Sequence, residues 1–170
     1  MQQLVDAVAQ LFQGAPGSDA QRAANEWLLQ LQHSDDAWSI ALQVLRADLL
    51  PAPSATALDS TVRVVALQLL RAKVDTRWHC AAPGLRNDVL QTIAEWLGAA
   101  SARVATEPSL RAAFRLACVT MAAFIARDED GTTWSMFWPQ QTNADSLVQV
   151  SVSVLGPCLW HPLDAMRDRD

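Results

Sequence analysis

The sequence predicts an all-α protein, and three observations support this prediction. Apolar residues recur at helical spacing along most of the 170-residue chain, so that successive segments each present one apolar face. Short polar breaks and segments rich in Pro and Gly separate these stretches. The second helices of successive pairs are expected to begin near residues 19, 59, 109 and 144, a mean spacing of about 42 residues. This period is typical of HEAT or armadillo repeats, and we expect a solenoid of about four antiparallel helix pairs.

The first pair is expected to consist of helices over residues 2–13 and 19–33. The Gly-Ala-Pro-Gly segment between them ends the first helix. Ser18, with Gln21 three residues later, predicts a capping box at the start of the second helix. Each helix has one apolar face that needs a neighbour, so the two should pack against each other. The residues of these faces are Leu4, Val8, Leu11 and Phe12, then Ala20, Ala23, Ala24, Trp27, Leu28 and Leu31.

The second pair is expected over residues 35–49 and 59–75. Ser34 is placed to cap the first of these helices. The Pro-Ala-Pro-Ser loop at 51–54 keeps the first helix from continuing, because Pro lacks the amide hydrogen that a helix interior needs. The apolar faces consist of Trp38, Ala41, Leu42 and Leu45, then Val62, Val65, Ala66, Leu69 and Leu70.

The third pair is expected over residues 84–100 and 109–127. The segment Thr106-Glu107-Pro108 begins the second of these helices, since Pro is tolerated in a first turn. From Leu116 onward this helix is apolar almost all round, so its second half should pack on more than one side. The apolar faces consist of Leu85, Val89, Ile93, Trp96 and Leu97, then Leu110, Ala113, Phe114, Ala117, Met121 and Phe124.

The fourth pair is the least regular. A short helix at 133–138 is ended by Pro139. In the last segment, Val148, Val150, Val152 and Val154 alternate with other residues at the period of a strand, although the segment also fits a helix. We favour the helix, because a lone strand would have no partner. The repeats are then expected at about 2–33, 35–76, 84–127 and 132–158, in a single array over residues 1–170.

Four of the seven tryptophans belong to the first three predicted pairs or their connections. We interpret Trp27, Trp38, Trp78 and Trp96 as packing residues within and between repeats, and not as residues that stack on a ligand. Their helical spacing and the large area that an indole ring buries favour this interpretation.

The composition excludes several classes of protein. A net charge of −5 and a pI of about 5.0 argue against binding of nucleic acid, which needs a basic face, but are compatible with a basic protein partner. Cys80, Cys118 and Cys158 are widely spaced and predict no disulfide framework. The N-terminal segment lacks the basic residues of a signal peptide, and the longest apolar run, near 116–126, is too short to span a membrane.

No pattern of residues predicts enzyme chemistry, a metal site or a cofactor. His79 and Cys80 are adjacent and lie far from Cys158 and His161, whereas zinc prefers two close pairs of ligands. The six glycines form no phosphate-binding loop. The acidic groups at 35–36 and 128–130 are typical of helix caps and turns. A helical-bundle enzyme is therefore the least supported class.

Several segments resemble a known family. Residues 22–38 (RAANEWLLQLQHSDDAW), 65–74 (VALQLLRAKV) and 86–93 (RNDVLQTI), together with Trp78 and Trp134, are similar to the N-terminal repeats of the importin-beta superfamily. The similarity is greatest to the branch that includes transportin-SR, the import receptor for serine/arginine-rich proteins. Members are several times longer than this chain. It is therefore expected to be the N-terminal part of a longer receptor, or else a short divergent relative.

The resemblance implies a function in transport between nucleus and cytoplasm. In the family, the N-terminal repeats bind the small GTPase Ran in its GTP form on the inner surface made by the second helices. That binding is coupled to the loading or release of protein cargo, which is here expected to be basic or SR-rich. Nucleoporins are further partners that the resemblance implies. The alternative is a helical-repeat scaffold or adaptor that has no dependence on Ran.

Polar residues on the second helices are the candidate contacts with Ran. Arg71 lies off the apolar stripe of its helix, and Lys73 lies closer to it with an ammonium group that can reach solvent. The competing interpretation is that both side chains are solvated charges that only interact favourably with the negative C-terminal end of the helix dipole and contact no partner. The full candidate set is Gln21, Asn25, Gln68, Arg71, Lys73, Arg111 and Arg115.

Overall fold

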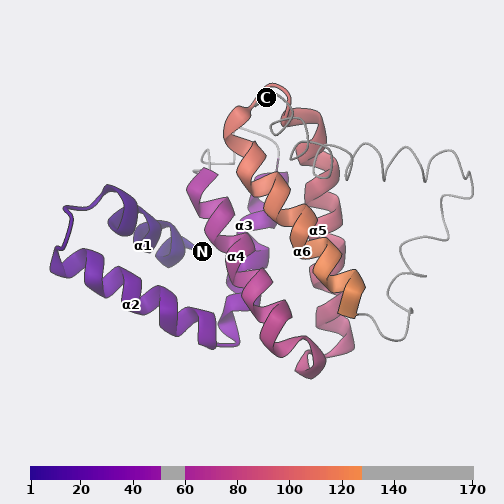
Figure 1. Ribbon diagram of the computed structural model, residues 1–170, viewed down its shortest axis with the longest axis horizontal. Helices are drawn as coiled ribbons and strands as arrows, with labels where there is room; N and C mark the ends of the chain where they lie inside the picture. Colours follow the sequence, from indigo (N-terminus) through magenta and orange to yellow (C-terminus); the bar gives the residue numbers. More distant parts are fainter. Residues whose placement is uncertain (51–59, 128–170) are drawn as a thin grey trace, which may run out of the picture. The chain divides into compact units, whose positions relative to one another are not determined.

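A computed structural model describes residues 1–50 and 60–127 (Figure 1). Within these residues the chain forms six α-helices, two short 3-10 helices and no strand, which confirms the all-α prediction. Their ends lie within three residues of those predicted. The elements are α1 (Gln2–Gln13), α2 (Asp19–His33), α3 (Asp36–Leu49), α4 (Ser60–Arg77), η1 (Trp78–Cys80), α5 (Pro83–Arg103), η2 (Pro108–Leu110) and α6 (Arg111–Arg127).

The chain divides into two compact units, Met1–Ala123 and Phe124–Asp170. The helices α1 to α5 and residues 111–123 of α6 belong to the first unit. The Pro-rich loop at 51–54 and the predicted fourth pair, with its ambiguous last segment, lie outside the described residues. The same holds for Trp134, Cys158 and His161. The single array of four repeats over the whole chain therefore stays a prediction.

Ser18 caps α2, as expected, whereas Ser34 lies one residue before Asp35, the N-cap residue of α3. The Ser18 hydroxyl accepts a hydrogen bond from the Gln21 amide at 3.2 Å. The Gln21 side chain completes the cap one residue earlier than in a regular capping box, because its Oε1 accepts from the Gly17 amide at 2.7 Å. The Ser34 hydroxyl accepts from the amide of Asp36, the first residue of α3, at 3.0 Å.

The core of the first unit is richest in α3, α4 and α5. Buried apolar residues lie along one face of each, and α3 packs against both α4 and α5. Trp38, Trp78 and Trp96 are buried, as predicted. The buried apolar residues of these helices include Ala41, Leu42, Val44, Leu45, Val62, Ala66, Leu67, Leu70, Val74, Val89, Leu90, Ile93, Leu97 and Ala100.

The pair formed by α1 and α2 is more exposed than predicted. On α2 only Ala24 and Leu31 are buried, and Trp27, which we interpreted as a packing residue, is half-buried. Phe12, at the end of the predicted stripe of α1, is 61% exposed. Figure 1 shows α1 and α2 as a hairpin, and its main contacts with the other described helices are those with α3 and α4. Within the described residues these contacts cover only part of the α1–α2 pair, and this explains the exposure.

The second half of α6, which we expected to pack on more than one side, is buried in part. Val119 is 52% exposed and Ile125 is 41% exposed, so this half is not enclosed on every side. The segment Pro108–Arg127 is long and apolar enough to cross a membrane by length and composition. However, 44% of its most apolar window is buried within the protein, and a core helix passes the same test. The segment is therefore weak evidence for a membrane span.

Candidate functional site

The structure brings Arg71 of α4 against α6. The Arg71 guanidinium donates to the backbone carbonyl of Val119 at 2.9 Å and to Asp75 at 2.8 Å. Arg115 lies four residues before Val119 and Arg111 eight residues before it, so the three share one face of α6. Arg111 and Arg115 are exposed, and neither has a polar partner within the described residues. Two of the predicted contact residues thus extend the surface that begins at Arg71.

The remaining surface candidates lie on α2 and α4. Asn25 and Gln68 are exposed, as expected for residues that contact a partner. Gln21 is half-buried, and its side chain is already used within the protein. Its Nε2 donates to the Leu11 carbonyl at 3.0 Å and its Oε1 accepts from Gly17. Gln21 therefore holds α1 against α2 and offers little to a partner.

Lys73 lies inside the protein. Its side chain is 1% exposed, and its ammonium nitrogen is 3.9 Å from a carboxylate oxygen of Asp35, which is itself 90% exposed. The sequence suggested that this ammonium reaches solvent, and the structure corrects that. Lys73 stands three residues after Leu70 and seven after Ala66, on the same buried face, so α3 covers it. It is not available to a partner on the surface.

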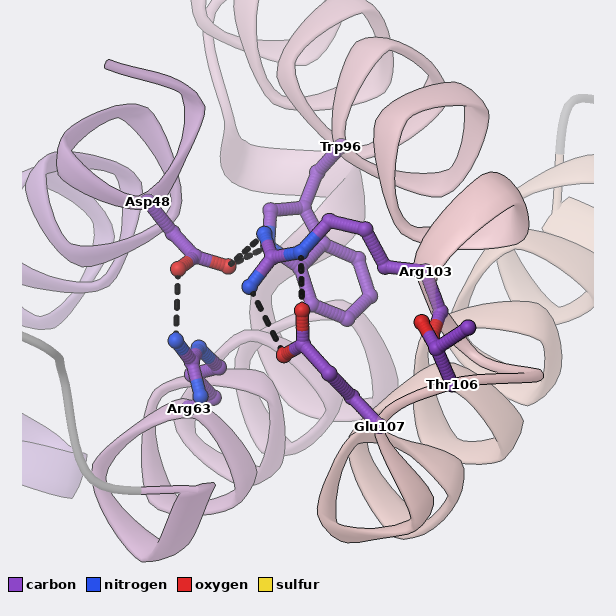
Figure 2. A network of polar contacts seen from close by, with 6 residues as sticks. All are labelled: Asp48, Arg63, Trp96, Arg103, Thr106 and Glu107. Carbon is purple, nitrogen blue, oxygen red and sulfur yellow. Dashed lines mark hydrogen bonds and ion pairs between the residues drawn. The ribbon is translucent and has the colours of Figure 1, made fainter. Parts of the chain in front are cut away.

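Asp48 is the centre of a buried polar network that the sequence analysis missed (Figure 2). Its side chain is 5% exposed. One carboxylate oxygen accepts from Arg63 Nη2 of α4 at 2.7 Å, and the other accepts from Trp96 Nε1 of α5 at 2.9 Å. Arg103, at the end of α5, adds an ion pair at 3.7 Å. Three helices thus share one carboxylate, and we call these four residues the Asp48 network.

The network continues to the connection before α6. The Arg103 guanidinium donates to both carboxylate oxygens of Glu107, each at 3.0 Å. These hydrogen bonds lower the pKa of the Glu107 carboxyl below its ordinary value and raise the pKa of Arg103 above its own. Figure 2 shows both groups on the side of Asp48 away from α3.

Glu107 makes the stability of the fold sensitive to acid in a defined direction. Because the pKa of Glu107 is lower in the folded chain, its contribution is present above the unfolded pKa of roughly 4.3 and is lost as the pH falls through the folded value. We expect Arg103→Gln to raise the pKa of Glu107 toward that ordinary value. An NMR titration of the Glu107 side-chain carboxyl carbon measures it. Arg115→Gln is the control, since Arg115 is not in the network, and an equal shift in both variants would contradict the assignment.

The connection between α4 and α5 is held by an aromatic pair and an arginine. The rings of Trp38 and Trp78 lie 6.4 Å apart, centroid to centroid, and the Arg86 guanidinium lies 5.4 Å from the centroid of the Trp78 ring. Arg86 also donates to the carbonyls of Ala81 and His79, at 2.9 Å each. Contacts with α3 and α5 therefore hold this connection in place.

No group of three or more potential metal ligands occurs among residues 1–50 and 60–127. Cys80 is an exposed free thiol and Cys118 a buried one.

The fold and the exposed polar helices define a helical-repeat protein with surfaces suited to protein partners. Residues 24–99 match the family model of the importin-beta N-terminal domain, from within α2 to within α5. This match supports the importin-beta superfamily, whose members are transport receptors and not enzymes. It does not distinguish the transportin-SR branch. No curated protein and no solved structure matches the chain.

Proposed function

We propose that the chain is the N-terminal region of a nuclear transport receptor and binds Ran in its GTP form. The observation that carries this proposal is the match of residues 24–99 to the importin-beta N-terminal domain, which binds Ran-GTP in members of that family. The matched segment includes Asn25, Gln68 and Arg71, whereas Arg111 and Arg115 of α6 lie beyond it.

The contacts of Arg71 give the proposed surface its shape. Arg71 is fixed by Asp75 and by the Val119 carbonyl, so its guanidinium links α4 to the face of α6 that carries Arg111 and Arg115. Those two guanidinium groups are exposed without a partner in the described residues, and they are free to pair with an acidic patch on Ran. We propose Asn25, Gln68, Arg71, Arg111 and Arg115 as the contact set, without Lys73 and Gln21.

The test compares Ran loaded with GTP and Ran loaded with GDP in binding to the 170-residue chain, by isothermal titration calorimetry. We expect clear binding of the GTP form and much weaker binding of the GDP form. The double variant Arg111→Glu/Arg115→Glu should weaken binding of the GTP form by at least about ten-fold, because two attractive charges become repulsive. Circular dichroism should show unchanged helicity, since both side chains are exposed.

The control is Arg77→Glu, an exposed charge reversal at the end of α4 and outside the contact set. If both forms of Ran bind equally, or neither binds, the transport proposal is wrong and a scaffold or adaptor without Ran dependence remains. If the GTP form binds and the double variant has no effect, Ran is the partner but the contact set is wrong.

We further propose a single helical array over residues 1–170 and a receptor related to the transportin-SR branch that couples Ran to cargo. The net charge of −5 supports a basic or SR-rich cargo. Importin-beta receptors shuttle between nucleus and cytoplasm, so both compartments, and contact with nucleoporins, belong to this proposal.

A further inference from the structure

A groove lies between α3, the start of α5 and the connection from α4 to α5. It has a volume of about 450 Å³ and is partly open to solvent. Its apolar part consists of Leu85 of α5 and Ala81 of the connection, both half-buried, and of the edges of Trp38 and Leu42 of α3, which are only 5% and 3% exposed. None of the proposed Ran contacts lines it. The groove is therefore a surface apart from the proposed Ran contact set.

The walls of the groove are held in place before any ligand arrives. The Trp38 ring packs against Trp78, and Arg86 lies over Trp78 while donating to the carbonyls of His79 and Ala81. On the opposite wall, Arg46 of α3 pairs with Asp88 of α5 and donates to Thr92 at 3.2 Å. A preformed groove loses little conformational entropy on binding, which favours binding of any ligand that fits. The apolar part of the lining favours an apolar ligand.

The charges at the rim indicate what kind of guest fits. Asp88 is neutralised by Arg46, and the carboxylate of Asp35 lies 3.9 Å from the ammonium of Lys73. Arg77 also lines the groove, is exposed, and has no polar partner within the described residues. The lining thus holds two cations and two carboxylates, and Arg77 is the one of these four without a polar partner in the described residues.

We propose that this groove binds a short segment of a partner protein that presents an apolar side chain next to a carboxylate. The apolar side chain lies on Trp38, Leu42 and Leu85, and the carboxylate pairs with Arg77. The proposal does not depend on Ran, because the groove and the Ran contact set share no residue. A receptor could hold both partners at once.

The probe is the capped pentapeptide acetyl-Ser-Leu-Asp-Ser-Ser-amide, titrated into the isotope-labelled 170-residue chain and followed by NMR. We expect chemical-shift changes confined to the groove residues, with a dissociation constant on the order of 1 mM, because a single apolar side chain is buried. The peptide with Asn in place of Asp should bind about three- to five-fold more weakly, since an exposed ion pair contributes little. The peptide with Ala in place of Leu should not bind measurably.

Two variants with matched controls test the two halves of the proposal. Ser39→Trp fills the groove and should abolish binding. Its control is Ser101→Trp, because both serines are exposed and donate their hydroxyl to the carbonyl three residues earlier, at 3.0 and 2.7 Å. Arg77→Gln should remove the preference for Asp over Asn in the peptide, and its control, Arg111→Gln, should retain that preference.

The outcomes separate clearly. Binding that survives Ser39→Trp, shift changes outside the groove, or no binding at all would each overturn the proposal. Retention of the Asp preference in Arg77→Gln would overturn the assignment of the carboxylate. Failure of the Ran experiment leaves each of these results unaffected, since the groove variants lie outside the Ran contact set.

Discussion

Asp48→Ala is expected to lower the free energy of unfolding by about 3 kcal/mol, because it leaves the guanidinium of Arg63 buried without its anion. The Arg63 side chain is 8% exposed, and its Nε already lacks a hydrogen-bond acceptor among the described residues. The substitution also removes the acceptor for the Trp96 indole. Urea denaturation followed by circular dichroism measures the change.

Asp88→Ala is the matched control for that prediction. Asp88 also pairs with an arginine, Arg46, but the two side chains are 45% and 49% exposed. Exposed pairs contribute at most about 1 kcal/mol, so this variant should lose far less. Equal losses in the two variants would show that burial of the Asp48 network does not matter for stability.

The double variant Asp48→Leu/Arg63→Met separates the cost of an unpaired charge from the value of the pair. Replacing a buried ion pair by apolar residues of similar volume is often neutral or stabilising. We therefore expect the double variant to recover most of the stability that Asp48→Ala loses. A double variant as unstable as Asp48→Ala would instead show that Trp96 and Arg103 depend on the carboxylate itself.

Lys73→Glu is expected to destabilise the fold by about 3 kcal/mol or more, because it buries a carboxylate close to that of Asp35. Lys73→Met should leave stability unchanged or raise it, since the methionine fills the same space without a charge. The control on the same helix is Gln68→Glu, which is exposed and should change stability by less than about 0.5 kcal/mol. Chemical denaturation of the three variants compares them directly.

This prediction also affects how the Ran experiment is designed. A charge reversal at Lys73 would weaken binding by unfolding the chain, and the loss could be mistaken for a lost contact. Arg111 and Arg115 avoid this problem because they are exposed. If Lys73→Glu were as stable as the native chain, the buried placement of Lys73 would be contradicted.

The helices could be predicted because their signals are local. Periodic apolar residues, the Ser18 cap and Pro108 each act within one or two turns, and the structure confirms the helices they indicated. Burial of the α1–α2 pair was overestimated because a stripe shows that a face is apolar, and does not show whether a neighbour covers it. The half-buried Trp27 and the exposed Phe12 are the result.

The Asp48 network could have been suspected from charges that oppose the helix dipole. Asp48 lies in the last turn of α3 and Arg63 in the first turn of α4, and each is the unfavourable sign for its position. When two such side chains pair with each other, the ion pair compensates for the unfavourable interaction of each charge with its own helix dipole. What the sequence does not contain is the distance between them, which depends on how α3 packs on α4. The same is true of Lys73, whose burial depends on the position of α3.

The Asp48 network also constrains the order in which the chain can fold during synthesis. Arg63 follows Asp48 by 15 residues, whereas Trp96 follows it by 48. Once α3 and α4 have been synthesised, Asp48 and Arg63 can form their ion pair while the other carboxylate oxygen of Asp48 is still in water. The second carboxylate oxygen gains its donor, the Trp96 indole, only after α5 has emerged from the ribosome. Until then we expect this oxygen to stay hydrated, so the core is completed only after α5 is available.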